Sequence, residues 1–392
     1  MSDWIVIIGG RSAAVEAALA LNLEVLLVAE PKTPARLFAK CALSFSVNLR
    51  TPIEQLLPSI LNVLGNIQPA AVIAVTEQGV LPAAYVREHF KLFGQSVDSA
   101  RASLIKSSMK QCFINANLPC WPTVAIASVD QAVEQAKAFS YPVIVKALAS
   151  SGSRGLRVVK DRSALRRVTK SMLQREEYGG VGLEPFCEAR ECSVELILQQ
   201  GRVLFSNITD YLVTSCVNLL PANFPPEMTQ RLLDLSQQIV ETFSFTSGMV
   251  HIEFYYTDTD IWIGEINARP PGGGLMDLIE RAYKIDPWQL VIKAQLNEPL
   301  EPVNTTRCRH AANWIIHPGK GEITEINGVD SLASHPLTAN FKLKLKVGQK
   351  VMRREGTGES VGTLTMVHAN YKKLKDAILN SRTELDIKKV PI

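Results

Sequence analysis

Residues 248–274 read GMVHIEFYYTDTDIWIGEINARPPGGG, and this stretch decides the fold. Two apolar runs flank the short polar turn at residues 257–260, which predicts an antiparallel β-hairpin. If the hairpin is symmetric about Thr259, Glu253 lies directly opposite Glu265. Directly opposed residues share a face and have Cβ atoms about 4.5–5.5 Å apart. The stretch therefore predicts two carboxylates side by side on neighbouring strands.

The alternation of side chains along a strand extends this polar face. Opposed carboxylates repel each other in a dry site, so they need a proton, a cation or water. With the Asn267 carbonyl they form a set of oxygen ligands that suits Mg²⁺ or Mn²⁺. The alternative is a solvated hairpin face, on which His251 is a structural hydrogen-bonding residue. One face would carry His251, Glu253, Glu265, Asn267 and Arg269, and the other would give the core Val250, Ile252, Phe254, Ile266 and Ala268.

Several residues around the hairpin suit the binding of anions. Arg269 can clamp phosphoryl oxygens, because its guanidinium offers several N–H groups in one plane. The glycines that follow could open a helix whose free N–H groups face an anion. Lys146 closes an apolar strand and precedes a loop rich in Gly and Ser at residues 149–155. Such a loop can cover phosphates, although its spacing is not that of a Walker P-loop and a plain hairpin loop is the alternative.

Two further patterns receive simpler interpretations. Gly9-Gly10 after the first strand, with Glu30 about twenty residues on, invites a dinucleotide-binding interpretation. The glycine pattern is broken there, so a helix entry turn is preferred. Lys342, Lys344 and Lys346 alternate with apolar residues, which predicts a strand with one basic face, solvated at a sheet edge.

Composition bounds the class of protein. The 392 residues suggest two to three domains, and 46% hydrophobic with 20% charged residues is ordinary for a globular chain. A net charge of +4 favours neither nucleic acid nor a membrane surface as a partner. The longest apolar runs are too short for a membrane span, and no secretory signal is visible. The seven cysteines lack metal spacing, so we expect free thiols in a soluble cytoplasmic protein, with a disulfide or thiol site as the alternative.

The order of predicted elements gives the fold class, α/β followed by α+β. Short apolar strands alternate with helices over the first hundred residues, which predicts a parallel sheet. Helices are expected at residues 103–116, 161–177 and 227–243. A further helix follows Ser128, with Gln131 as its capping-box partner, and belongs to a small module of two helices on a sheet. From residue 305 onward, short strands and a helix at 371–380 are expected.

Taken together, these pieces resemble the ATP-grasp superfamily, and more closely its carboxylate–amine ligases, the branch that includes L-amino-acid ligases. The resemblance is clear over about residues 1–300 and looser afterwards. Four elements occur in family order: IKSSMKQCFINANLPCWPT at 105–123, the Lys146 strand with its SSGSRG loop, LEPFCEARECSV at 183–194, and the hairpin.

The resemblance implies roles for individual residues. Lys106 and Lys146 match the lysines that contact the ATP phosphates, and Lys146 and Arg269 are the expected catalytic cations. Glu191 matches the acid that holds the ribose hydroxyls. The phosphate loop would include Ser151, Gly152, Ser153 and Gly155, the adenine-binding strand Glu184, Pro185 and Phe186, the metal site Glu253, Glu265 and Asn267, and the acyl-substrate site Arg269, Gly272, Gly273 and Gly274.

The same resemblance implies an activity: ATP and Mg²⁺ would activate a small-molecule carboxylate as an acyl phosphate, and an amine would then form an amide. Amino acids are the expected substrates, and relatives suggest a homodimer. The linker usually has a second acid where Pro185 stands and a glycine where Ala189 stands. Adenine contacts through the backbone tolerate both changes. The alternatives are another nucleophile, a biotin-dependent carboxylase component or a non-catalytic ATP-binding protein, and a nicotinamide dehydrogenase is the weakest.

The implied architecture is the ATP-grasp fold of three domains, with nucleotide between two α+β lobes. We expect a Rossmann-like N-terminal domain at 1–103 that shapes the substrate side. A central lobe at 104–185 would carry the phosphate loop. A C-terminal lobe at 186–392 would carry the metal site and, from about 305, a strand-rich subdomain.

Overall fold

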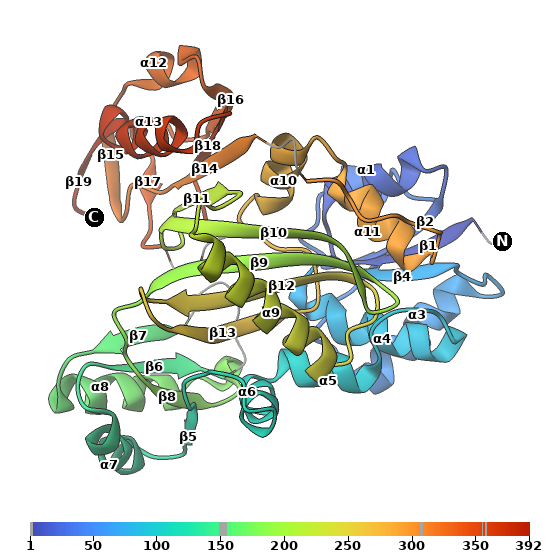
Figure 1. The fold of residues 1–392 in the computed structure, drawn as a ribbon, viewed down its shortest axis with the longest axis horizontal. Helices are drawn as coiled ribbons and strands as arrows, with labels where there is room; N and C mark the ends of the chain where they lie inside the picture. Colours follow the sequence, from blue (N-terminus) through green and yellow to red (C-terminus); the bar gives the residue numbers. More distant parts are fainter. Residues whose placement is uncertain (1–2, 149–154, 306–308, 355, 357–358) are drawn as a thin grey trace.

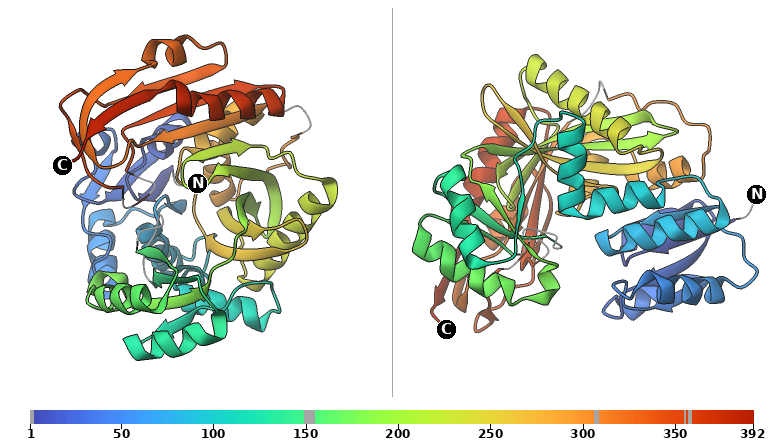
Figure 2. Two further views of the ribbon diagram at one scale, coloured as in Figure 1. Left: turned by 90° about the vertical axis from the view of Figure 1, so that its left-hand side faces the viewer. Right: turned by 90° about the horizontal axis from the view of Figure 1, so that it is seen from below.

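A computed structural model describes residues 3–148, 155–305, 309–354, 356 and 359–392 (Figure 1). Its strands form four sheets. In Figures 1 and 2 the N-terminal sheet and the small sheet of residues 124–185 lie at separate ends of the largest sheet. None of the helices in the described ranges is both long and apolar enough to cross a membrane.

The N-terminal sheet is fully parallel, as the sequence predicts. Its strand order is β3-β2-β1-β4, and every neighbouring pair runs in the same direction. Apolar residues fill both of its faces, because helices cover both sides. Its strands are β1 (Trp4–Ile8), β2 (Glu24–Ala29), β3 (Leu43–Ser46) and β4 (Ala71–Ala74), and its helices α1 (Ser12–Ala20), α2 (Ala35–Phe38), α3 (Ile53–Leu64) and α4 (Glu77–Phe90).

The predicted helix at 103–116 is wrong in one respect, because two helices occupy this region. Helix α5 (Val97–Leu104) ends and helix α6 (Lys106–Asn115) begins on either side of Ile105. Ile105 has an extended backbone, with φ −90° and ψ 108°, and its side chain is half exposed. The break makes Lys106 the first residue of α6.

The small α+β module forms as expected. Its antiparallel sheet has the order β5-β8-β6-β7. The Ser128 hydroxyl accepts a hydrogen bond from the Gln131 amide at 3.1 Å, which confirms the predicted cap. The helix predicted at 161–177 stops at Leu173 and a short 3₁₀ turn follows. The elements are β5 (Val124–Ile126), α7 (Val129–Phe139), β6 (Val143–Ala147), β7 (Leu156–Val159), α8 (Arg162–Leu173), η1 (Glu176–Tyr178) and β8 (Val181–Pro185).

The largest sheet has the strand order β13-β12-β9-β10-β11-β14-β18-β16. Helix α9 (Pro226–Thr242) packs on one face, and helices α10 (Leu275–Tyr283) and α11 (Pro287–Gln295) pack on the other. Its strands are β9 (Arg190–Gln199), β10 (Arg202–Val213), β11 (Val217–Leu220), β12 (Gly248–Tyr256), β13 (Ile261–Asn267), β14 (His310–Ile316), β16 (Thr338–Leu343) and β18 (Gly362–His368).

The C-terminal residues partly extend this sheet, since β14, β18 and β16 join it directly. Lys342 lies in β16, but Lys344 and Lys346 lie beyond its end, so the predicted basic strand face is too long. The remaining elements are helix α12 (Val329–Ser334), helix α13 (Tyr371–Glu384) and the small sheet of β15 (Gly321–Asn327), β17 (Lys350–Val351) and β19 (Asp386–Val390).

Arg87 of α4 is a buried cation that ties the N-terminal sheet together. Its side chain is 4% exposed and donates to the carbonyls of Val72, at 2.9 Å, and Gln95, at 3.0 and 3.1 Å. Burial lowers the pKa of Arg87 to about 10. These bonds therefore give hydrogen-bond donors to two backbone carbonyls.

We predict that Arg87→Met lowers the free energy of unfolding by about 2–4 kcal/mol, because it leaves buried carbonyls without donors. Thermal denaturation measures this as a lower Tm. The exposed Arg167→Met in helix α8 serves as the matched control and leaves Tm unchanged. An unchanged Tm in Arg87→Met would contradict the structural role of the guanidinium.

Candidate functional site

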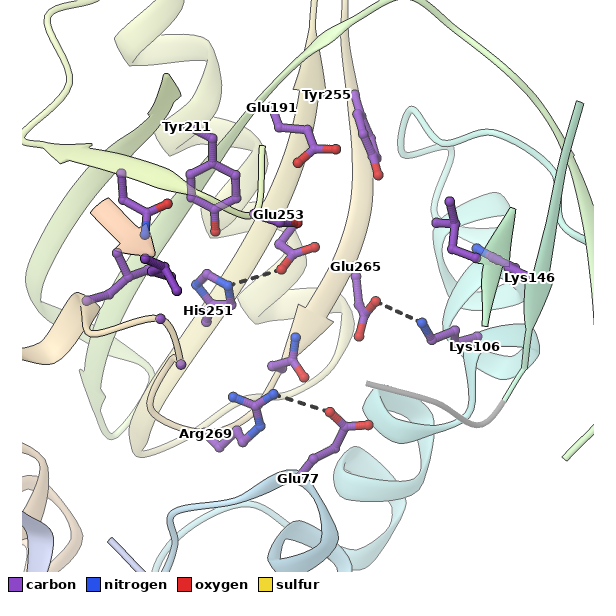
Figure 3. Close-up of a pocket in the computed structure, with 18 of the residues that line it drawn as sticks. Glu77, Lys106, Lys146, Glu191, Tyr211, His251, Glu253, Tyr255, Glu265 and Arg269 are labelled. Atoms are coloured by element: carbon purple, nitrogen blue, oxygen red, sulfur yellow. Dashed lines mark hydrogen bonds and ion pairs between the residues drawn. The ribbon is translucent and has the colours of Figure 1, made fainter. Parts of the chain in front are cut away.

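A cavity of about 180 Å³ lies where the large sheet, the small module and helix α4 meet (Figure 3). The hairpin β12–β13 forms its floor, and the lysines of α6 and β6 face that floor. Nine of its lining residues are among the predicted site residues: Lys106, Lys146, Glu191, Glu253, Glu265, Asn267, Arg269, Gly272 and Gly273.

The register of the hairpin confirms the opposed carboxylates. Glu253 pairs with Glu265, and His251 pairs with Asn267. All four line the cavity, so they share one face of the sheet. The register shifts directly after Glu253 and leaves Gly264 between the two paired segments. The pairing of the site residues is therefore symmetric about Thr259. The pairs between the site and the turn are shifted from that symmetric register by one residue.

Lys106 faces this carboxylate pair from α6. Its Nζ lies 3.0 Å from Glu265 Oε2, an ion pair that Figure 3 shows bridging the cavity. Burial alone would lower the pKa of Lys106, but the Glu265 carboxylate outweighs burial and raises it. Conversely, burial opposes the charge of Glu265, yet Lys106 holds the pKa of that carboxyl below its usual range. Both groups are therefore charged at neutral pH.

Lys146 of β6 is the second cation on this side. Burial lowers its pKa to about 8, although an ion pair with Glu184 opposes the shift. The Thr123 hydroxyl also donates to Glu184. Burial alone would raise the pKa of Glu184, but Lys146 and Lys110 hold it below the usual value. The Glu184 side chain is thus occupied by Lys146 and lies outside the residues that line the cavity.

Glu191, Tyr211 and Tyr255 line the other end of the cavity. Burial, with repulsion from Glu253, raises the pKa of Glu191 to about 7. Tyr255 packs against Trp121, with ring centroids 5.2 Å apart. This end therefore combines an acid with two aromatic side chains.

A buried polar network lies beside the hairpin, on the neighbouring strands β9 and β10, and centres on Glu195, which is fully buried. The carboxylate accepts from Ser193 Oγ at 2.6 Å and Thr209 Oγ1 at 2.8 Å. The Asn207 amide also donates to it. His251 joins the network to the site, with Nδ1 3.0 Å from Glu195 and Nε2 3.4 Å from Glu253.

The network fixes the charge of His251. Burial alone would lower the pKa of His251, but the hydrogen bonds with Glu195 and Glu253 raise it to about 9. The imidazole is therefore protonated on both ring nitrogens and positively charged at neutral pH. In this form it holds the Glu253 carboxylate in place. Sequence reasoning missed Glu195, although polar residues alternating within otherwise apolar strands β9 and β10 are a visible signal.

Arg269 lies at the edge of the cavity that faces the N-terminal sheet. Its Nη2 lies 3.2 Å from Glu77 Oε2, and its Nη1 donates to the Pro270 carbonyl at 3.1 Å. Among the described residues, none accepts a hydrogen bond from the buried Nε of Arg269. Sequence reasoning missed Glu77, the first residue of α4, since nothing local marks its contact with a residue 192 positions away.

The glycine segment after Arg269 is only partly in the cavity. Gly272 and Gly273 line it, whereas Gly274 lies at the N-cap of helix α10 with φ +77°. The predicted helix opening is thus confirmed. The Asn313 amide donates to the Gly273 carbonyl at 2.7 Å, which anchors the segment to β14.

Other predicted contacts lie outside the cavity lining. Gly155 lies beside β6, where its carbonyl accepts from Ala147 at 3.0 Å. Pro185 ends β8, and the Phe186 amide donates to Pro142 at 3.3 Å. The predicted phosphate-loop residues Ser151, Gly152 and Ser153 fall outside the described residues.

The donor set suits a hard divalent cation that also binds a phosphate ligand. Among the described residues, no three His, Cys, Asp or Glu side chains are grouped to hold a metal ion by themselves. Glu253, Glu265 and Asn267 instead offer two carboxylates and one amide oxygen on a single face. Mg²⁺ commonly uses one or two carboxylates together with substrate phosphates and water. The residues therefore fit such an ion.

Part of the chain is similar in sequence to known proteins. Residues 106–269 match the family described as carbamoyl-phosphate synthase L chain, ATP binding domain. An L-arginine-specific L-amino acid ligase of Bacillus subtilis is 22% identical over 237 residues, 56% of this chain and 55% of that protein. The match thus spans about half the length of this relative.

Solved structures resemble the chain over nearly its full length. An L-amino acid ligase from Bacillus licheniformis has a TM-score of 0.80 at 18% identity, covering 99% of this chain and 98% of its own. An N5-carboxyaminoimidazole ribonucleotide synthetase from Thermotoga maritima has a TM-score of 0.74 at 18% identity, with both chains fully covered. At these identities the likeness shows a shared fold.

We predict that the metal-free protein loses the stabilisation from His251 at high pH. A folded pKa of about 9 against an unfolded value of about 6.5 means that the contribution is complete below about pH 6.5 and fades as pH rises through 9. The Tm difference between the wild type and His251→Gln, measured in chelator, is therefore largest near pH 6. The exposed His89→Gln is the control, and a difference that grows with pH would contradict the assignment.

Proposed function

On the premise that this chain is an ATP-grasp protein, by its fold and by the sequence of residues 106–269, we propose that it is an ATP-dependent carboxylate–amine ligase. It would join a small-molecule acid to an amine, with amino acids as the substrates, and would release ADP and phosphate. The distant L-amino acid ligase relatives support this choice within the superfamily.

One observation carries the proposal. Glu253 and Glu265 lie opposite each other on one face, and Lys106 and Lys146 line the same cavity from the other side. A nucleoside triphosphate with a divalent cation contains both kinds of partner, because its phosphates attract the lysines and its metal attracts the carboxylates. The cavity is therefore complementary to both components of a metal–triphosphate complex.

The residues of the chain would divide the work of phosphoryl transfer. Lys106 and Lys146 would hold the phosphates, and the guanidinium of Arg269, which lines the same cavity, would stabilise the transferred group. Glu253, Glu265 and Asn267 would hold a magnesium ion, which supplies neutralisation of the phosphate charge. Phosphoryl transfer depends mainly on positioning and electrostatics, so a site of fixed cations and no protein nucleophile is sufficient.

The proposed reaction has two steps. A substrate carboxylate oxygen attacks the γ-phosphorus of ATP, the bond to the bridging oxygen breaks, and ADP leaves as an acyl phosphate forms. The amine nitrogen then attacks the acyl carbon, loses a proton and expels inorganic phosphate. Exclusion of water protects the acyl phosphate from hydrolysis.

The nucleoside would lie towards β8 and the start of β9. We propose that backbone groups of residues 184–186 contact adenine, since the Glu184 side chain already pairs with Lys146. Glu191 would accept from the ribose hydroxyls, and Tyr255 would pack near the base, supported by Trp121. Domain boundaries near residues 103 and 185 fit this arrangement, with nucleotide between the second and third domains.

We predict that Glu265→Gln reduces amide formation by at least about 100-fold, because it removes one metal-binding carboxylate and the partner of Lys106. A coupled assay for ADP release with mass spectrometry of the product measures this. Glu134→Gln, on the exposed face of α7, is the matched control. Undiminished ATP turnover in Glu265→Gln would rule out the metal assignment.

We predict that ATP binding near pH 8.5 takes up protons. Burial lowers the pKa of Lys146 to about 8, and a triphosphate beside Nζ would favour the charged form. Titration calorimetry in buffers of different ionisation enthalpy measures the uptake. Lys146→Arg, which stays charged, abolishes it, and Lys146→Ala weakens ATP affinity at least about tenfold. Buffer-independent heats with the wild type would contradict the phosphate contact.

A further inference from the structure

Three cavities meet at one carboxylate, that of Glu77. It lines the cavity of the candidate site, a second cavity of about 830 Å³ and a third of about 380 Å³. The second, here called the strand-end cavity, lies at the carboxyl ends of the parallel strands β1 to β4, where substrates commonly bind in open α/β sheets. The third, here called the apolar chamber, lies between the segment after β3 and helices α4 and α5.

The strand-end cavity is strongly ionic. Arg269 lines both this cavity and the candidate site, so the two adjoin each other. Arg11 is partly buried and donates to the Pro271 carbonyl at 2.5 Å. Burial, with repulsion from Arg269, lowers the pKa of Arg11 to about 10. The cavity can therefore stabilise the charged end of a polar substrate.

The apolar chamber differs in character. Glu77 is the one acid among its lining residues, and Arg50 is the one cation. The chamber runs along the face of α4 from Glu77 to Leu81, which lies one helical turn further on. The rest of its wall is mostly aliphatic, supplied by Leu49, Pro52, Ile53, Leu81, Pro82 and Leu104.

The Arg269–Glu77 ion pair is complementary to a zwitterion. It offers a cation to a carboxylate and an anion to an ammonium group. The carboxylate of an α-amino acid can take the place of Glu77 beside Arg269. Its ammonium group can take the place of Arg269 beside Glu77. The two side chains lie 3.2 Å apart, so adjacent substrate groups suffice to reach both. A substrate held in this way has its carboxylate beside the phosphoryl site, and its side chain can enter the chamber that Glu77 also lines.

We infer that the apolar chamber receives an apolar side chain of the amino acid whose carboxylate is activated. This inference rests on the proposed function. A cationic side chain is disfavoured for two reasons. Glu77, the one acid among the lining residues, is engaged by the substrate ammonium, and Arg50 repels a second positive charge. An acidic side chain would lie among aliphatic groups that provide no hydrogen bonds.

The test measures ADP release and amide formation with L-leucine, L-methionine, L-phenylalanine, L-arginine and L-aspartate as the acid, with a common amine. We expect kcat/KM for the apolar acids to exceed that for arginine and aspartate by at least about tenfold. Leu81→Trp fills the chamber and raises KM for leucine at least about tenfold, with KM for ATP unchanged. Leu81→Glu shifts the preference towards arginine.

Controls separate a local effect from misfolding. Ile114→Trp and Ile114→Glu make the same changes at a half-exposed residue of α6, outside the three cavities, and leave every constant unchanged. If Leu81→Trp does not fold, Leu81→Ala enlarges the chamber and shifts the preference from leucine to phenylalanine.

The outcomes distinguish this inference from the proposed function. Amide formation with equal or higher kcat/KM for arginine or aspartate overturns the inference alone. An unchanged KM for leucine in Leu81→Trp, or an unchanged leucine-to-phenylalanine preference in Leu81→Ala, does the same. Absence of amide with any amino acid, despite ATP binding, overturns the proposed function and this inference with it.

Discussion

Attraction between opposite charges on two lobes is the interaction on which the site depends. Lys106 from the helical connection and Glu265 from the hairpin form an ion pair across the cavity. A triphosphate bound with its cation, as proposed, would offer each of them a new partner of the right sign, so binding would exchange charge pairs and leave no buried charge alone. Such an exchange limits the desolvation cost that buried ions otherwise incur.

The large sheet makes this arrangement possible, because its two faces have different tasks. Aliphatic residues of one face pack against α9. The other face carries the acids of the site and, further along the strands, the apolar residues that pack against α11. The buried carboxylate of Glu195, on the adjacent strand β9, supports this polar face through His251. Rigid strands and a satisfied hydrogen-bond network therefore position the acids, as the proposed binding of a metal ion would require.

Local patterns in the sequence predicted the parts of the site that depend on strand geometry. The opposition of Glu253 and Glu265 followed from alternation and a short turn, and the cap at Ser128 followed from its spacing to Gln131. The contact of Glu77 with Arg269 and the break at Ile105 could not be predicted in this way. The first depends on how distant elements pack, and the second on a single backbone conformation within a stretch of helix-forming residues.

The connection between α6 and the small module is bound to the hairpin itself. The Ile263 amide of β13 donates to the Pro119 carbonyl at 2.8 Å, and Trp121 stacks on Trp262 with centroids 4.8 Å apart. A displacement of the small module that carried residues 119–121 with it would therefore also move the strand that bears Glu265. Through this connection, the position of a carboxylate and the width of the entrance would change together.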